Sequence, residues 1–347
     1  MTFRISRRLF LSSSLLNVAL SASSCSQARK SLAKNALQDP KLNFTSNVYV
    51  WFPDGRVKNL TPMSGIFYQS CINLDGTHVV FSGNSAGVLK VWRTDVETGE
   101  TIALTNDGYA ARHPVFSSAG DEIAYSADQF SGQEPEKIEQ LTKSGLPPEE
   151  HIDHIFVMDT NGRNKRQITH GLYQDQRPCF SPDGKTIAFI SNRGASFFGL
   201  WSVPSDGSDE PKLIAEIRGA DSYTAPISAP AKTNELRNII YRPWYSVDGK
   251  TIYVFSDIAG RHQICSIPAT GGVITPLAND DAGRSHGPYA DPNGKTLLMH
   301  STRDGDYTIW ELPLGGGSPR RLQPPGIDGA THATRSRSGI IAFDVVH

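Results

Sequence analysis

Six positions of this 347-residue chain occupy the same place in a sequence repeat, and most of them carry a basic or amide side chain. Each lies seven residues before the glycine of a predicted turn. They are Gln69, His113, Arg177, Arg242, Gly287 and His332. A further histidine, His286, immediately precedes the glycine of this set. Equivalent positions of a closed repeat fold face one common axis, so we expect these side chains to ring one mouth of a central channel.

Two kinds of chemistry fit these residue types. The two arginines, helped by the histidines and the Gln69 amide, would bind a carboxylate or another anion through charge-assisted hydrogen bonds. Because imidazoles contribute, the affinity for an anion is expected to rise as the pH falls through about 6.5. Alternatively, His113, His286 and His332 would hold a divalent metal ion. A solvated polar lining without a specific ligand is the third interpretation. The residues leave these alternatives open, and we predict no resident cofactor.

The repeat that places these residues is clearest in two segments. Residues 177–191 read RPCFSPDGKTIAFIS, and residues 242–256 read RPWYSVDGKTIYVFS. Within SPDG, proline fixes φ at the second turn position and glycine accepts a positive φ at the fourth. The turn glycines recur with a base spacing of about 45 residues. A period of 40–45 residues is typical of a propeller blade of four strands.

The two ends of the repeat complete each other. Residues 331–346 form a first half with no second half after it, and residues 48–61 form a second half with no first half before it. We therefore predict an all-β, six-bladed β-propeller over residues 46–347, with the N-terminal strands closing the last blade. Two insertions interrupt the repeat, at about 129–151 and about 216–240. Insertions of this kind often build a binding face.

Composition excludes several classes of protein. The formal net charge is −1, and 38% of the residues are hydrophobic. This chain is too apolar to be disordered and too polar to be a multi-span membrane protein. The near-neutral balance argues against a nucleic-acid partner. The four cysteines form no CxxC pair, which argues against a cysteine-based zinc site, and we expect Cys71 and Cys179 to be small buried residues.

The N-terminus predicts export. Residues 1–25 combine a basic start with an apolar stretch too short to span a bilayer. The segment SRRLFL resembles the twin-arginine signal of bacterial proteins exported in the folded state. Cys25 follows a sequence that is similar to a lipobox, so lipidation at Cys25 and ordinary cleavage near Ser23 both remain open. Residues 26–45 are polar and read as a linker.

Taken together, SPDGKTIAF, a following tryptophan-bearing strand and a D-G turn resemble the WD-like repeats of the TolB family. That resemblance implies a propeller without the α/β domain of TolB, for which residues 26–45 leave no room. It implies a monomeric binding or interaction module, periplasmic or tethered to the membrane. The partner would be an envelope protein or an acidic ligand such as an acidic peptide. Non-enzymatic binding is therefore the expectation. The enzymatic alternative is a metal-dependent polysaccharide lyase similar to the oligogalacturonate lyases.

Overall fold

The fold was analysed in a computed structural model that describes residues 45–84, 88–106, 108, 110–128, 152–171, 173–193, 198–216, 240–256, 263–277 and 284–347. These residues form 24 β-strands and no helix. Accordingly, the described part contains no helix long and apolar enough to cross a membrane. The signal-like segment with Cys25, the linker up to residue 44, the first insertion and nearly all of the second lie outside the described residues.

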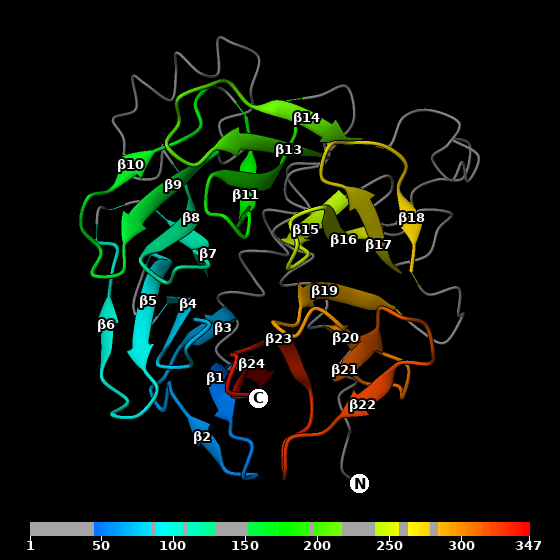
Figure 1. Ribbon diagram of the computed structural model, residues 1–347. Coiled ribbons are helices and arrows are strands. Elements are labelled where there is room, and N and C mark those ends of the chain that lie inside the picture. Colours follow the sequence, from blue (N-terminus) through cyan, green and yellow to red (C-terminus); the bar gives the residue numbers. More distant parts are fainter. Residues whose placement is uncertain are drawn as a thin grey trace, which may run out of the picture.

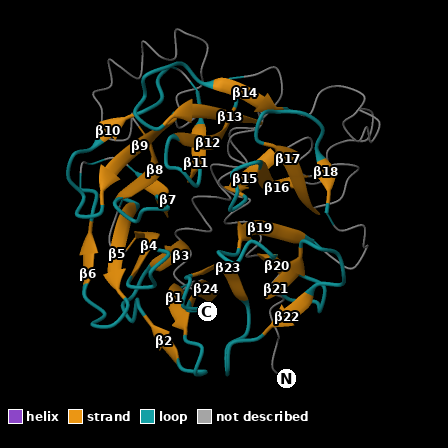
Figure 2. Cartoon of the chain, in the orientation of Figure 1, coloured by secondary structure: helices purple, strands orange, loops and turns teal. Residues whose placement is uncertain are grey.

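The strands are arranged around a central channel, and each repeat unit runs from the channel to the rim (Figures 1 and 2). The inner strands are β3 (Ile66–Ile72), β7 (Ala111–Phe116), β11 (Asp175–Phe180), β15 (Ile240–Tyr245), β19 (Ser285–Ala290) and β23 (Ala330–Arg335). The second strands are β4 (His78–Asn84), β8 (Glu122–Asp128), β12 (Thr186–Ser191), β16 (Thr251–Ser256), β20 (Thr296–Ser301) and β24 (Ile341–Val346).

The third and fourth strands complete the units toward the outside (Figure 1). The third strands are β5 (Lys90–Asp95), β9 (Asp153–Asp159), β13 (Gly199–Pro204), β17 (Gln263–Pro268), β21 (Thr308–Pro313) and β1 (Ser46–Trp51). The fourth strands are β6 (Thr101–Ala103), β10 (Arg166–Gln167), β14 (Lys212–Ala215), β18 (Thr275–Pro276), β22 (Arg320–Leu322) and β2 (Val57–Asn59). Neighbouring strands within each unit run antiparallel.

The prediction of six blades is wrong: the propeller has four separate four-stranded blades. These are β7–β10, β11–β14, β15–β18 and β19–β22, and the remaining eight strands form one continuous sheet. Within that sheet, β1 pairs with β24 along its whole length and also meets β3 through the pair Ser46 and Ile66. At this junction the Ser46 amide donates to the Gly65 carbonyl at 3.3 Å. The Ser46 hydroxyl adds two bonds, because its Oγ donates to the Phe67 carbonyl at 2.8 Å and accepts from the Phe67 amide at 2.9 Å. The two terminal units are therefore not separate blades.

The turns between inner and second strands follow the sequence prediction. At Ser181–Gly184, the glycine has φ of 72° and its amide donates to the Ser181 carbonyl at 2.9 Å. The Asp183 carboxylate accepts from the Ser181 hydroxyl at 2.6 Å and from the Lys185 amide at 3.1 Å. Side chain and backbone therefore fix each turn locally, which sets the register of the hairpin that follows.

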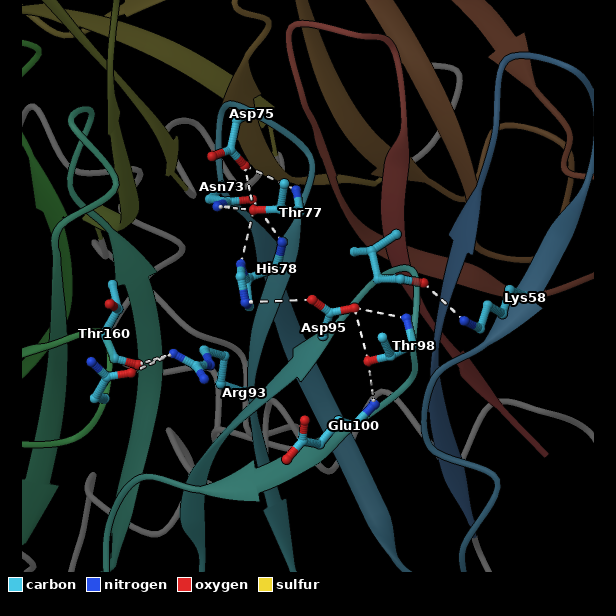
Figure 3. Close-up of polar contacts among 12 residues, drawn as sticks. Lys58, Asn73, Asp75, Thr77, His78, Arg93, Asp95, Thr98, Glu100 and Thr160 are labelled. Carbon is cyan, nitrogen blue, oxygen red and sulfur yellow. Dashed lines mark hydrogen bonds and ion pairs between the residues drawn. The ribbon is translucent and has the colours of Figure 1, made fainter.

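Apolar side chains fill the space between neighbouring sheets. Cys179 and Leu200 from one blade, for example, pack with Ile240 and Ile252 from the next. At the rim, basic side chains join adjacent units through carbonyl groups (Figure 3). Lys58 Nζ donates to the carbonyl of Val96 at 2.9 Å, and Arg93 Nη1 donates to that of Thr160 at 2.6 Å. Packing between sheets and these rim contacts hold the units around the channel.

Candidate functional site

Every inner strand contains a β-bulge, and the residue at the bulge is the one that the repeat alignment singled out. The register shifts once in each inner pair, for example between Gln176 and Cys179. All six bulge residues have positive φ: Gln69 (57°), His113 (58°), Arg177 (56°), Arg242 (54°), Gly287 (61°) and His332 (53°). Such a backbone is uncommon for a residue other than glycine, and bulges serve to re-aim side chains. The ring lies within the inner strands rather than at their start, so it is inside the channel.

Polar side chains of the preceding unit hold four of the six bulges. In each case the backbone amide of the bulge residue donates to a side chain in the second strand of the preceding unit, and the four acceptors occupy the same position of the repeat. The pairs are His113 N to Ser82 Oγ at 3.0 Å, Arg177 N to Ser126 Oγ at 3.1 Å, His332 N to His300 Nδ1 at 3.5 Å, and Gln69 N to Asp344 Oδ2. The remaining two second-strand positions hold Ile190 and Phe255, whose side chains offer no acceptor to Arg242 and Gly287.

The two ring arginines converge without a carboxylate partner among the described residues. Arg177 is 5% exposed, and its guanidinium lies 4.0 Å over the Tyr241 ring. With the Gln69 amide oriented so that its oxygen faces Arg177, that oxygen accepts from both terminal nitrogens, at 2.9 and 3.2 Å. Arg177 Nε and Arg242 Nη1 are buried with no hydrogen-bond partner. Burial, with the like charge of Arg177, lowers the pKa of Arg242 to about 10, which leaves it protonated at physiological pH.

Ring histidines are neutral, contrary to the sequence expectation. Burial and the nearby arginines hold the pKa of His113 and of His332 well below 6.5. The same causes lower the pKa of His300, which the sequence analysis did not select. A buried imidazole beside two guanidinium groups resists a further positive charge. The prediction that His113 and His332 become protonated near pH 6.5 is therefore wrong.

Asp344 supplies a carboxyl group beside the ring of bulge residues, and the sequence analysis did not identify it. Its Oδ2 lies 2.9 Å from His332 Nδ1, and its Oδ1 accepts from the Ser70 amide at 3.2 Å. Burial raises the pKa of Asp344 to about 7 although Arg242 favours the charged form. A signal was present in the sequence: a charged residue interrupts the apolar strand IAFDVV, as a histidine interrupts LLMHS at His300.

The ring borders a small cavity in the channel. It has a volume of about 30 Å³, and its polar lining includes Gln69, His113, Arg177 and Arg242. Farther along the inner strands the lining becomes apolar and includes Cys71, Val115 and Trp244. The Trp244 indole packs against core residues from several units, and its centroid lies 4.6 Å from that of the Tyr289 ring, with the two rings tilted. Trp244 therefore extends across the channel and narrows it. Other units place Cys, Val, Tyr or Thr at this position. The larger side chain of Trp244 was therefore a sign of the narrowed channel that the sequence analysis did not use.

The three histidines considered for a metal ion are held by different partners. His113 Nδ1 lies 3.3 Å from Ser126 Oγ, His286 Nε2 lies 3.1 Å from the Tyr307 hydroxyl, and His332 pairs with Asp344. The His286 imidazole also packs against the Phe255 ring, with centroids 4.2 Å apart, so His286 lies beside the bulge residues rather than among them. Across the described residues, no three His, Cys, Asp or Glu side chains are placed to hold a metal ion together.

Comparisons with known proteins support a TolB-type propeller. No family model matches the chain. It is 35% identical over 75 residues to the Tol-Pal system protein TolB of Zymomonas mobilis, covering 21% of this chain and 16% of that protein. It is 27% identical over 242 residues to the Tol-Pal system protein TolB of Francisella tularensis, covering 69% and 46%. The matched region therefore spans less than half the length of either relative.

Solved structures agree on the fold. A TolB structure from Agrobacterium tumefaciens superposes with a TM-score of 0.64 at 17% identity, covering 88% of this chain and 99% of that one. An oligogalacturonate lyase in complex with manganese superposes with a TM-score of 0.52 at 14% identity, covering 86% and 77%. At such identities the likeness concerns the propeller alone, since one propeller fold hosts many functions. The chain is thus similar to TolB propellers in both sequence and fold.

Proposed function

We propose that this protein is an exported, TolB-like binding or interaction module of the periplasm whose ligand presents a carboxylate to the channel. A partner protein of the cell envelope with an acidic segment fits this role. The similarity to TolB proteins supports the periplasmic setting and the binding role. Tethering through a lipidated Cys25 is part of the proposal and rests on the sequence of the N-terminal segment.

One observation carries the choice of ligand: two buried guanidinium groups share a channel and have no ion-pair partner among the described residues. Elsewhere in the described part, buried arginines do have carboxylate partners. Arg112 lies 3.3 Å from Asp153, and Arg193 pairs with Asp175. Burying a charge without a partner is costly, and the β-sheets do not require arginine at the bulge. A carboxylate from outside would supply the missing partner through charge-assisted hydrogen bonds.

Titration of the purified protein with short acidic peptides and with oligouronates tests this proposal. Each charge-assisted hydrogen bond contributes about 1.5–3 kcal/mol, so Arg177→Ala is expected to weaken binding roughly ten- to hundred-fold. Arg320→Ala is the control, because this arginine lies at the rim with a 69% exposed side chain. Affinity should be higher at pH 5.5 than at pH 8, since Asp344 is protonated at pH 5.5 and carries no competing negative charge there. Binding that is indifferent to Arg177 and Arg242 would contradict the proposal.

The metal-dependent lyase is the alternative. Neighbouring imidazoles of His286, His300 and His332 lie 5.6 and 4.9 Å apart between ring centroids, but no three such side chains of the described residues are placed to hold a metal ion together, so this alternative requires them to move. Metal analysis of the protein after gel filtration discriminates the two functions: stoichiometric Mn²⁺, together with cleavage of oligogalacturonate, would support the lyase. The pH trend also differs, because metal binding would weaken at low pH as imidazoles protonate.

A further inference from the structure

We infer that the cavity beside the ring is a subsite for a single carboxylate group of a monoanion, and this inference rests on the proposed function. It goes further by fixing the size and charge of what enters. One group of this kind can come from a free small carboxylic acid or from one acidic side chain of a partner peptide. The shared chemistry is a planar carboxylate with a small alkyl carbon.

Size is the first constraint. A cavity of about 30 Å³ holds about two water molecules, which is close to the bulk of one carboxylate group. Trp244 limits extension toward the turns, because its indole packs against residues on several sides of the channel. Gly287 lies outside the lining but packs close to Arg242: a Cβ there would lie 3.0 Å from Arg242 Nη1 and 2.7 Å from His300 Cε1.

Charge is the second constraint. Arg177 and Arg242 contribute two positive charges, and neutral His113, His300 and His332 add none. Asp344, the carboxyl group of the ring, contributes one negative charge when it is ionised. Above about pH 7, where Asp344 is ionised, one positive charge remains, which one monoanion neutralises. At such a pH a doubly charged phosphate or sulfate would exceed that balance.

The lining is the third constraint and favours a carboxylate over a halide. Gln69, His113 and the two arginines are among the lining residues, but most of the cavity surface is apolar, with Cys71, Pro178 and Trp244 in its wall. Guanidinium groups match the two oxygens of a carboxylate, and the apolar wall matches its attached carbon. Arg177 Nε and Arg242 Nη1 are buried without partners, so they are the donors that a carboxylate would satisfy.

Thermal unfolding of the full mature protein in an anion series tests the subsite directly. At pH 7.5 and matched ionic strength, formate and acetate should raise the melting temperature in a dose-dependent way, whereas pivalate and chloride should not. Arg242→Met should lose at least roughly nine-tenths of the formate affinity, a ten-fold effect or more for a charge-assisted contact. This variant should also fold without formate, because it removes a buried charge that lacks a partner. Arg320→Met, at the rim, is the matched control and should keep the full response.

A second variant tests the apolar wall. Trp244→Phe shortens the wall, so it should let a larger carboxylate such as pivalate stabilise the protein, while the formate response remains. No stabilisation by formate, equal stabilisation by chloride, or a full formate response in Arg242→Met would overturn the inference.

Competition separates this inference from the proposed function. Acidic peptide that binds and is displaced by formate supports both. Acidic peptide that binds but is not displaced by formate overturns the carboxylate subsite and leaves the binding function standing. Formate binding without binding of any acidic peptide supports the subsite and contradicts the proposed function.

Discussion

Asp344 gives this protein a pH dependence of folding whose sign and size follow from its surroundings. The carboxyl is 1% exposed and lies beside the Ser70 amide and the His332 ring. Burial raises its pKa from 3.8 to about 7, while hydrogen bonds and the Arg242 charge oppose that rise. Between those two pH values the folded chain keeps a proton on Asp344 that the unfolded chain has lost.

Proton linkage converts this difference into stability. Because the pKa is raised in the folded state, the stabilisation is full below about pH 4 and is lost as the pH rises through about 7. A pKa difference of about three pH units corresponds to about 4 kcal/mol of unfolding free energy. Above pH 7 the ionised, buried carboxylate weakens the ring by that amount relative to a neutral group.

The Asp344→Asn variant tests this reasoning. Its amide oxygen can still accept from the backbone of Gln69 and Ser70, but the side chain cannot ionise. Urea unfolding of both proteins should show the variant gaining on the wild type by up to about 4 kcal/mol between pH 4 and pH 8. Comparing two otherwise identical chains cancels the titration of most other groups.

A turn carboxylate supplies a control of opposite sign. The Ser181 hydroxyl and the Lys185 amide lower the pKa of Asp183, so its stabilisation is present above its ordinary pKa and is lost as the pH falls. Asp183→Asn should therefore lose ground to the wild type as the pH rises toward about 4, and should change little against the wild type from about pH 4 to pH 8. A difference between Asp344→Asn and the wild type that is constant from pH 4 to pH 8 would refute the account of Asp344.

Three further expectations concern the ring, the sheet and export. Gly287→Ala should lower the unfolding free energy by about 1–3 kcal/mol in urea, and clearly more than Gly184→Ala, where φ is also positive but no atom lies within 4 Å of the added Cβ. Deletion of residues 46–61 should abolish solubility, because it leaves β24 without its partner β1; a soluble, cooperatively melting product would contradict this. Replacing Arg7 and Arg8 with lysine should block export in a fractionation assay, and Cys25→Ala should release the protein from membranes if the cysteine is lipidated.

The alignment of repeats predicted the ring because its members share one sequence position and one backbone conformation. It could not predict the partners of the ring, because the second-strand position varies between Ser82, Ile190 and His300. Asp344 was also harder to align, since five residues separate the paired Arg335 and Ile341, against six between Phe180 and Ile187. The blade count failed for a local reason: the backbone and hydroxyl of Ser46 bond to Gly65 and Phe67 and so join two units that the repeat treats as separate.

The protonation state of the histidines at the bulges could not be predicted from the sequence, for a different reason. A histidine in a neutral chain is expected to titrate near its ordinary pKa, and only the fold shows that His113 is buried beside two guanidinium groups. The pH response that the sequence assigned to histidines therefore belongs to Asp344, whose burial raises its pKa. Anion binding is still expected to strengthen as the pH falls, but the group that titrates is Asp344 rather than a histidine.

The backbone of the ring itself argues for a ligand. Five of the six bulge residues adopt positive φ without being glycine, at a cost of the order of 1–3 kcal/mol each. Glycine would remove that strain, as Gly287 does at its own position. The polar side chains at the other five positions therefore offset the strain through the contacts that they make. Side chains of the preceding unit compensate four bulges, but the second-strand residues before Arg242 and Gly287 are apolar. The strain, the missing acceptors and the unpaired guanidinium charge therefore meet at Arg242, which is where an incoming carboxylate would stabilise the protein most.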